Sequence, residues 1–316
     1  MLTKSETVLD DLVMKRNGTQ KRIDYLAYVT RELPTSRQAG SRVLLEGPNP
    51  LHPAYHSFGN RALFNEAKEN CLLVVWLFSR IKVGRKSLPL ALDAKIVVHR
   101  SFERSKKLRY ATKREIQLLR KRQYLFKADQ KRSEYFPWKS GEDLFEGILR
   151  LFPNQKAKPE YFFRHGIKLP GEAVALLDEH AKKLSGCPRA FIGYKWAEGT
   201  PAALDVAECL DEQGVASWLD LWGMPRSVRE LKTEMREKSL WRYIKTAASE
   251  CRYRIVIRTA GSETGGAKRE LSMLRKLQRQ RPSIFIDLPG EWGSRSLALL
   301  RSDEVSTSHK SRIGLP

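Results

Sequence analysis

A glutamate and the glycine-rich segment before it are the residues whose types and spacing could do chemistry. The segment Gly261 to Gly266 follows an apolar stretch that predicts a strand and precedes a stretch of helical character that carries Glu270. Backbone N–H groups and the positive end of a helix dipole at such a junction bind phosphate, so a pyrophosphate fits there. A carboxylate beside a sugar ring stabilises the positive charge that develops when a glycosidic bond breaks. Glu270 is therefore a candidate for glycosidic chemistry on a phosphate-bearing ligand.

The C-terminal half must position these residues, and its pattern alternates strands with helices. Such alternation predicts an α/β unit with a flavodoxin-like parallel sheet and helices on both faces. Ligands of such sheets bind beyond the carboxyl ends of the strands, here at the loops that start at Lys195, Leu221, Ala260 and Pro289. The predicted strands are Arg189–Tyr194, Val215–Asp220, Tyr253–Thr259 and Ser283–Leu288, and the predicted helices are Pro201–Gln213 (stopped by Gly214), Leu231–Ser249 and Ala267–Gln280.

Three pieces of this half together resemble a TIR (Toll/interleukin-1 receptor) domain. The strand Phe191-Ile192-Gly193-Tyr194 resembles the family's opening strand, and Leu210 to Asp220, with Gly214 and Trp218, resembles its helix and second strand. Glu270 stands where members that cleave NAD carry their catalytic glutamate. The resemblance implies that residues 187–300 form a TIR-like domain whose substrate is NAD.

The resemblance further implies an NAD nucleosidase, either a glycohydrolase or an ADP-ribosyl cyclase, that releases nicotinamide in antiphage defence signalling. Glu270 is then the catalytic residue, NAD is a substrate, and no other cofactor is expected. Aromatic faces would hold the two rings of NAD. Activity is expected to require a homo-oligomer that assembles through the loop Leu221 to Ser227. The candidate NAD-binding residues are Tyr194, Trp196, Asp220, Trp222, Gly265 and Gly266.

Structural interpretations of the same residues stay open. An acidic residue early in a helix is favoured by the helix dipole alone, Asp220 is suited to capping a turn, and the glycines are suited to permitting one. Gly193 stands where the family has a serine, and Gly266 where it commonly has a tryptophan. These two residues favour an alternative from another class, a non-catalytic TIR adaptor with a basic half that binds nucleic acid.

Charge is the main compositional signal, and it is concentrated in the first half. The chain has 58 Lys+Arg against 36 Asp+Glu, a net charge of +22. Residues 1–186 hold 36 of the basic and 20 of the acidic residues, which gives +16. Ser105 to Lys131 predicts one long basic helix that attracts a polyanion, either nucleic acid or a nucleotide ligand. The candidate contacts are Arg104, Lys106, Lys107, Arg109, Lys113, Arg114, Arg120, Lys121 and Arg122.

The remaining patterns predict a mainly helical, basic N-terminal domain of residues 1–186 and a mobile tail of residues 301–316. The stop at Ser185-Gly186 marks the boundary to the TIR-like domain. The predicted helices of the first domain are Ser5–Met14, Arg22–Glu32, the basic helix, Glu142–Leu151 and Pro170–Leu184, and its predicted strands are Cys71–Phe78 and Lys95–Arg100.

The sequence argues against a membrane protein and against a metal-binding protein. The longest apolar run, Cys71 to Phe78, is far shorter than the ~20 residues that cross a bilayer, and the N-terminus does not have the pattern of a secretory signal. We therefore expect a cytoplasmic protein without membrane contact. The four cysteines form no CxxC pair, and Pro53 separates His52 from His56, so no metal site is expected.

Overall fold

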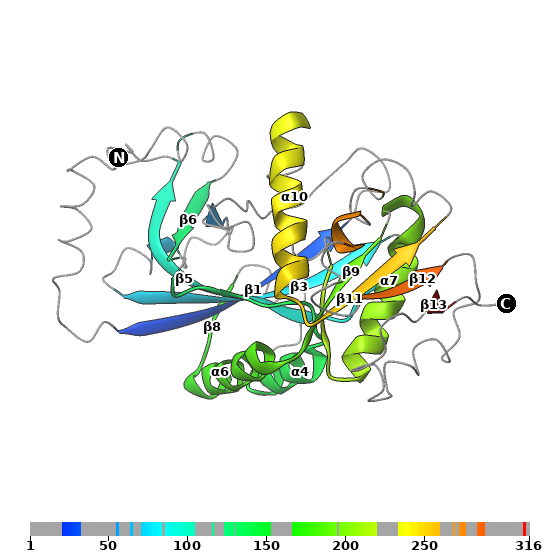
Figure 1. The fold of residues 1–316 in the computed structure, drawn as a ribbon. Helices are drawn as coiled ribbons and strands as arrows, with labels where there is room; N and C mark the ends of the chain where they lie inside the picture. Colours follow the sequence, from blue (N-terminus) through cyan, green and yellow to red (C-terminus); the bar gives the residue numbers. More distant parts are fainter. Residues whose placement is uncertain are drawn as a thin grey trace.

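A computed structural model shows a mixed α/β protein with two sheets (Figure 1). It describes residues 21–32, 55–56, 64–65, 71–83, 86–104, 116, 123–129, 131–152, 166–194, 196–219, 233–259, 268, 272–275, 283–287 and 312–313.

The first half is built around an eight-stranded mixed sheet. Its main path runs β2-β6-β5-β3-β1-β8, with β4 paired to β3 and β7 paired to β5. Only β1 and β3 run parallel, and the other pairs are antiparallel. The strands are β1 (Arg22–Glu32), β2 (Tyr55–His56), β3 (Leu72–Val83), β4 (Lys86–Ser87), β5 (Ala91–Glu103), β6 (Tyr124–Ala128), β7 (Glu134–Tyr135) and β8 (Ile167–Lys168).

The expectation of a mainly helical first domain is wrong, and β1 shows why. Arg22–Glu32, predicted as a helix, is a strand whose Ile23, Tyr25 and Ala27 pack on one face of the sheet. Leu26 packs on the other face, so the side chains alternate with a period of two. The aromatic and apolar residues of so short a stretch fit the period of a helix as well as that of a strand. Pairing with β3 along the whole length of β1 favours the strand.

The long basic helix predicted over Ser105–Lys131 is wrong at its C-terminal end. Tyr124–Ala128 forms β6, which pairs with β5 in antiparallel fashion, and Arg104 N donates to Gln123 O at 2.9 Å. Ile116 is helical, and residues 105–115 and 117–122 lie outside the described residues. The predicted strands Cys71–Phe78 and Lys95–Arg100 are confirmed within β3 and β5.

Two helices cover one face of the first sheet. They are α4 (Glu142–Arg150) and α6 (Gly171–Gly186), and both match the helices predicted there. Figure 1 shows them side by side below the sheet. Phe145 and Ile148 of α4 and Leu177 of α6 are buried against Trp76 and Phe78 of β3. On the opposite face of the sheet a second group of buried side chains includes Phe64, whose ring stacks on Tyr124 with centroids 4.8 Å apart.

The second half is a five-stranded parallel sheet in the order β10-β9-β11-β12-β13. In chain order this is 2-1-3-4-5, which is compatible with the predicted flavodoxin-like fold. The strands are β9 (Arg189–Gly193), β10 (Ala216–Trp218), β11 (Tyr253–Arg258), β12 (Ser283–Asp287) and β13 (Arg312–Ile313). β13 lies in the segment for which we expected a mobile tail, and the rest of that tail is outside the described residues.

Helices lie on both faces of this sheet, as predicted. Helix α7 (Trp196–Glu212) packs on Ile192, Ile255 and Ile257, and α10 (Thr233–Glu250) packs on the other face through Ile244. Figure 1 shows α10 standing on the opposite side of the sheet from α7. No helix of the described part of the chain combines the length and the apolar character that a bilayer crossing requires.

Gly214 ends α7 as its position in the sequence predicts. Its φ of 75° is in the left-handed region that favours glycine. Gly214 N donates to Asp211 O at 2.9 Å, and Val215 N donates to Leu210 O at 2.9 Å, which is the hydrogen-bond pattern of a Schellman motif. This turn brings the chain directly from α7 into β10.

Candidate functional site

The candidate site is the edge of the second sheet at which β9 and β11 end. The two strands are parallel neighbours, with Gly193 opposite Val256. Their connections leave in opposite directions along the sheet, since β9 is followed by the edge strand β10 and β11 by β12. This is the topological switch point, where a crevice for ligands opens in sheets of this order.

The first turn of α7 lies directly over this edge. An added Cβ at Gly199 would lie 3.0 Å from Tyr194 Cβ and 3.7 Å from Ile257 Cγ2, so the backbone of the helix approaches both strands closely. Glycine at position 199 permits that approach. The N-terminus of α7 therefore lies at the switch point, and the N–H groups of a helix N-terminus favour an anionic group.

Tyr194, a candidate for stacking on a ring of NAD, follows β9 at this edge. Its side chain is only 8% exposed and belongs to the core between the sheet and α7. In this conformation little of its ring is open to a ligand. Trp196, which we predicted in a loop, is the first residue of α7, and its side chain is not described.

The other predicted site residues lie outside the described residues. These are Asp220, Trp222, Gly265, Gly266 and the candidate catalytic Glu270. Their chain neighbours are described: Leu219 is buried against α7, and Leu274, helical as predicted, is buried against the α10 face. The structure thus describes the carboxyl ends of β9 and β11 and the start of α7. The position of the Glu270 carboxylate stays a prediction.

A segment of the first half is paired to the second sheet. Trp138 and Ser217 form an antiparallel bridge, which adds the chain at Trp138 to β10, the edge strand. Two further polar contacts lie beside it: Lys139 Nζ and Ser140 N both donate to Asp211 Oδ1, at 2.8 and 3.2 Å. Sequence reasoning missed this junction, because nothing in the periodicity of either segment marks its partner.

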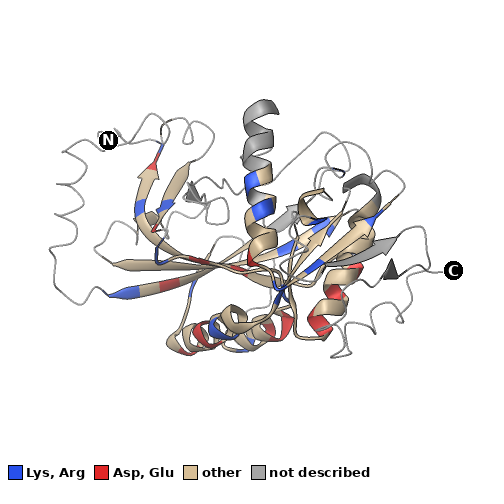
Figure 2. Cartoon of the chain, in the orientation of Figure 1, with Lys and Arg blue, Asp and Glu red and all other residues tan. Residues whose placement is uncertain are grey.

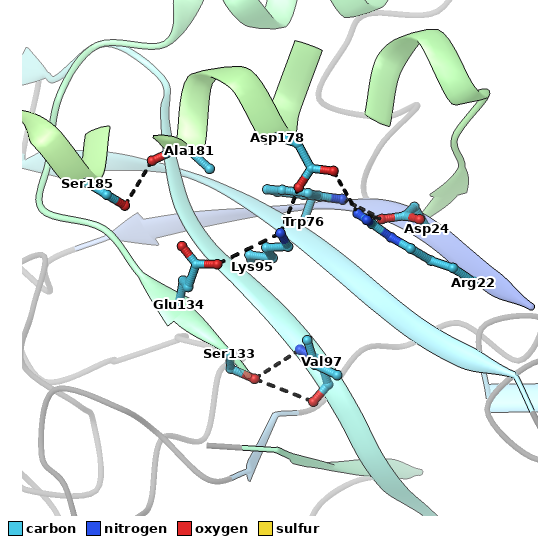
Figure 3. A network of polar contacts seen from close by, with 10 residues as sticks. All are labelled: Arg22, Asp24, Trp76, Lys95, Val97, Ser133, Glu134, Asp178, Ala181 and Ser185. Carbon is cyan, nitrogen blue, oxygen red and sulfur yellow. Dashed lines mark hydrogen bonds and ion pairs between the residues drawn. The ribbon is translucent and has the colours of Figure 1, made fainter. Parts of the chain in front are cut away.

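A second feature missed by sequence reasoning is a polar network between the first sheet and α6 (Figure 3). Asp24 Oδ1 accepts from Trp76 Nε1 and from Arg22 Nη2, each at 2.8 Å. Lys95 Nζ contacts Asp178 at 2.7 Å and lies 4.9 Å from the centroid of the Trp76 ring. Each charge is compensated locally, so the network fastens α6 to the sheet and offers no open ligand site. The described residues contain no cluster of three or more His, Cys, Asp or Glu suited to a metal.

Acidic and basic residues are unevenly distributed over the fold (Figure 2). Helix α7 has no Lys or Arg, and Figure 2 shows acidic residues on α7, α4 and α6 on the lower side of the view. It shows basic residues on β5, β6 and α10 on the upper side, and also on α6. Of the predicted polyanion contacts, Arg104 is described and exposed. The remaining eight (Lys106, Lys107, Arg109, Lys113, Arg114, Arg120, Lys121 and Arg122) lie outside the described residues.

Comparison with known proteins identifies no family for this chain. Neither a protein-family model nor a curated protein nor a solved structure matched the chain.

Proposed function

We propose that residues 187–300 are a TIR-type NAD nucleosidase that releases nicotinamide. The observation that carries the proposal is the parallel sheet of order 2-1-3-4-5, with the N-terminus of α7 at the carboxyl ends of β9 and β11. That edge suits a dinucleotide, because a helix terminus favours a pyrophosphate and ligands of such sheets bind beyond the carboxyl ends of the strands. The three sequence pieces that resemble a TIR domain support the same assignment.

In the proposed reaction the bond between ribose C1′ and the nicotinamide nitrogen breaks. The bonding electron pair leaves with nicotinamide, which departs neutral, and the positive charge passes to the ribose ring. The Glu270 carboxylate stabilises that charge and accepts hydrogen bonds from the ribose hydroxyls. Attack by water, with loss of its proton, gives ADP-ribose, whereas attack by the adenine of the same molecule gives the cyclic product.

The proposed role of Glu270 is consistent with its spacing from a described residue. Leu274, four positions later, is helical and buried against the face of the sheet that α10 covers. Residues four apart on a helix share a face, with the earlier residue one turn nearer the N-terminus. On the helix predicted over Ala267–Gln280, we therefore propose that Glu270 lies one turn nearer the loop after β11 than Leu274 does.

Nicotinamide release from NAD by the purified full-length chain tests the proposal. The assay compares wild type, Glu270→Gln and Glu250→Gln, where Glu250 is an exposed glutamate at the end of α10. We expect Glu270→Gln to lose at least about 100-fold in rate, since charge-stabilising groups of active sites contribute on this order. Glu250→Gln is expected to match wild type.

Assembly is part of the proposal, so the assay runs over a range of protein concentrations, with light scattering to report the oligomer present at each. We propose that the homo-oligomer forms through Leu221 to Ser227, as the resemblance implies. Robust activity that survives Glu270→Gln would contradict the site. Inactivity of every oligomer would favour the alternative, a TIR adaptor without catalysis, for which Gly193 and Gly266 argue.

A further inference from the structure

Two paired strands of the first sheet, β5 and β6, carry two cations at directly opposed positions. In the register of β5 and β6, Arg100 lies directly opposite Lys127. Both side chains are half-buried. Among the described residues neither cation forms an ion pair, and the one recorded contact of Arg100 is with the ring of Phe102, 5.7 Å from its centroid. Like charges at directly opposed positions destabilise a sheet, so this pair does not serve the fold.

The local backbone brings these cations together. The register of β5 against β6 shifts between Val98 and Arg100, so His99 is the extra residue of a β-bulge and is exposed. Bulges redirect side chains and increase the local twist, and they are frequent where a strand serves a function. Arg100 and Lys127 lie on the face opposite Phe126, whose ring is buried with Phe64. One face of the hairpin therefore fills this core, and the other carries the two cations beside the buried side chains of Phe102 and Leu125.

Further cations flank the pair along the two strands. Arg104, at the end of β5, is exposed, as are Lys131 and Arg132 in the turn after β6. This turn is held against β5 by a hydrogen bond of 2.8 Å from Asp129 N to Val97 O. Asp129 Oδ1 accepts from the backbone N–H groups of Lys131 and Arg132, at 3.0 and 3.3 Å, so this carboxylate orders the turn and supplies one negative charge beside the cations.

We propose that Arg100 and Lys127, with Arg104, Lys131 and Arg132 around them, form a site for the phosphate groups of a nucleic acid. Opposed cations on adjacent strands contact one phosphate together or two successive phosphates, and binding removes their repulsion. The row extends from the bulge to the end of the hairpin, which fits a chain of phosphates better than a single anion. Acidic residues of α7 and α4, which Figure 2 shows on the lower side of the view away from β5 and β6, would repel the same ligand, so binding is directed to the hairpin. This inference concerns the first half and does not depend on NAD cleavage.

The test measures binding of the full-length chain to a labelled DNA duplex of about 20 base pairs and to an RNA strand of similar length, over about 50 to 200 mM salt. The variant Arg100→Ala/Lys127→Ala is compared with Arg150→Ala/Lys182→Ala, which removes the same charge from exposed positions of α4 and α6. We expect the first variant to bind at least about 10-fold more weakly and its slope of log K against log salt to fall by about 1.8 on duplex or 1.4 on a single strand, for two lost phosphate contacts. The control is expected to keep the wild-type slope.

A second variant separates binding from folding. Lys127→Glu places a carboxylate opposite Arg100, so it is expected to raise the thermal midpoint while weakening nucleic-acid binding at least as much as the double alanine variant. Equal binding by wild type and both hairpin variants would overturn the proposal, as would equal losses in the control. Binding to an acidic peptide but to neither nucleic acid would also overturn it.

Discussion

Trp138 and Ser217 exchange two backbone hydrogen bonds of 2.7 Å, one in each direction, across the junction of the two sheets. On either side of Trp138 the same segment returns to the first sheet: Phe136 N donates to Asp93 O at 2.9 Å, and Gly141 N donates to Leu90 O at 2.8 Å. One stretch of six residues thus holds β5 and β10 together. It also covers the edge of the parallel sheet at β10, where an unpaired strand would invite another chain.

Replacement of Trp138 by alanine tests how firmly this junction couples the two halves. The side chain is fully buried among Ile81 and Ala91 of the first half and Ala190 and Ala203 of the second. Loss of a buried tryptophan leaves a cavity, so we expect the free energy of unfolding to fall by about 3 to 5 kcal/mol. Urea unfolding followed by circular dichroism measures this fall.

Leu176→Ala is the control, because Leu176 is 39% exposed on α6. It should change the free energy of unfolding by less than about 0.5 kcal/mol. Equal stability of the Trp138 and Leu176 variants would mean that the junction does not hold the halves together.

Asp24 is expected to contribute far more to stability than Asp178, although both bind Arg22 (Figure 3). The Asp24 side chain is 5% exposed, and its replacement by alanine leaves the buried Trp76 Nε1 without its acceptor. An unsatisfied buried donor costs about 1 to 3 kcal/mol. The Asp178 side chain is 38% exposed, so water screens its ion pairs and Asp178→Ala should cost at most about 1 kcal/mol.

Asp24→Asn distinguishes the hydrogen bond from the charge, because asparagine keeps an acceptor for Trp76 Nε1. We expect its stability to lie between that of wild type and that of Asp24→Ala in urea unfolding. Should Asp178→Ala prove the more destabilising of the two alanine variants, the ion pairs of α6 and not the buried acceptor would dominate this network.

His180 makes the stability of the protein depend on pH. Its pKa lies below the ordinary value, first because of burial and then because of the positive charges of Lys183 and Lys139. As the pH falls through about 6.5, the unfolded chain binds a proton that the native imidazole resists. The unfolded state is thereby favoured, so the contribution of His180 to stability is present above this pH and is lost below it.

Thermal midpoints at roughly pH 7.5 and 5.5 measure this effect on either side of the ordinary histidine pKa. His180→Gln, neutral at both values, should show a smaller drop than wild type. A drop in His180→Gln as large as that of wild type would assign the pH dependence to other groups.

The sequence predicts a helix or strand correctly where the interactions that decide its structure lie close together in the chain. In the second half the patterns of β9 to β12 and of the helices between them are recognisable, with a sharp end at Gly214, and the parallel α/β order follows from the alternation, whereas the two-residue β13 is not predicted. The first half fails at Arg22–Glu32, because pairing with β3, some 50 positions away, decides its structure. The bridge from Trp138 to Ser217 is equally non-local.

The candidate site likewise has features that the sequence predicts and features that distant contacts decide. The edge formed by the carboxyl ends of β9 and β11 is predictable because it follows from strand order. The burial of Tyr194 is not, since it depends on how closely α7 approaches at Gly199. Likewise the opposition of Arg100 and Lys127 depends on the register after the bulge at His99, which neither segment specifies alone.

Two glycine-to-alanine substitutions should change stability in opposite directions, because they differ in backbone conformation and not in side-chain contacts. At Gly214 and at Gly147 an added Cβ would meet no atom within 4 Å, but Gly214 has φ of 75°, whereas Gly147 lies inside α4. Alanine at 214 is forced into the left-handed region, which costs about 1 to 2 kcal/mol. Alanine at 147 loses less conformational entropy on folding than glycine and should stabilise by about 0.5 to 1 kcal/mol. Urea unfolding of the two variants beside wild type checks both signs, and a stabilising Gly214→Ala would show that α7 does not end in the left-handed turn described above.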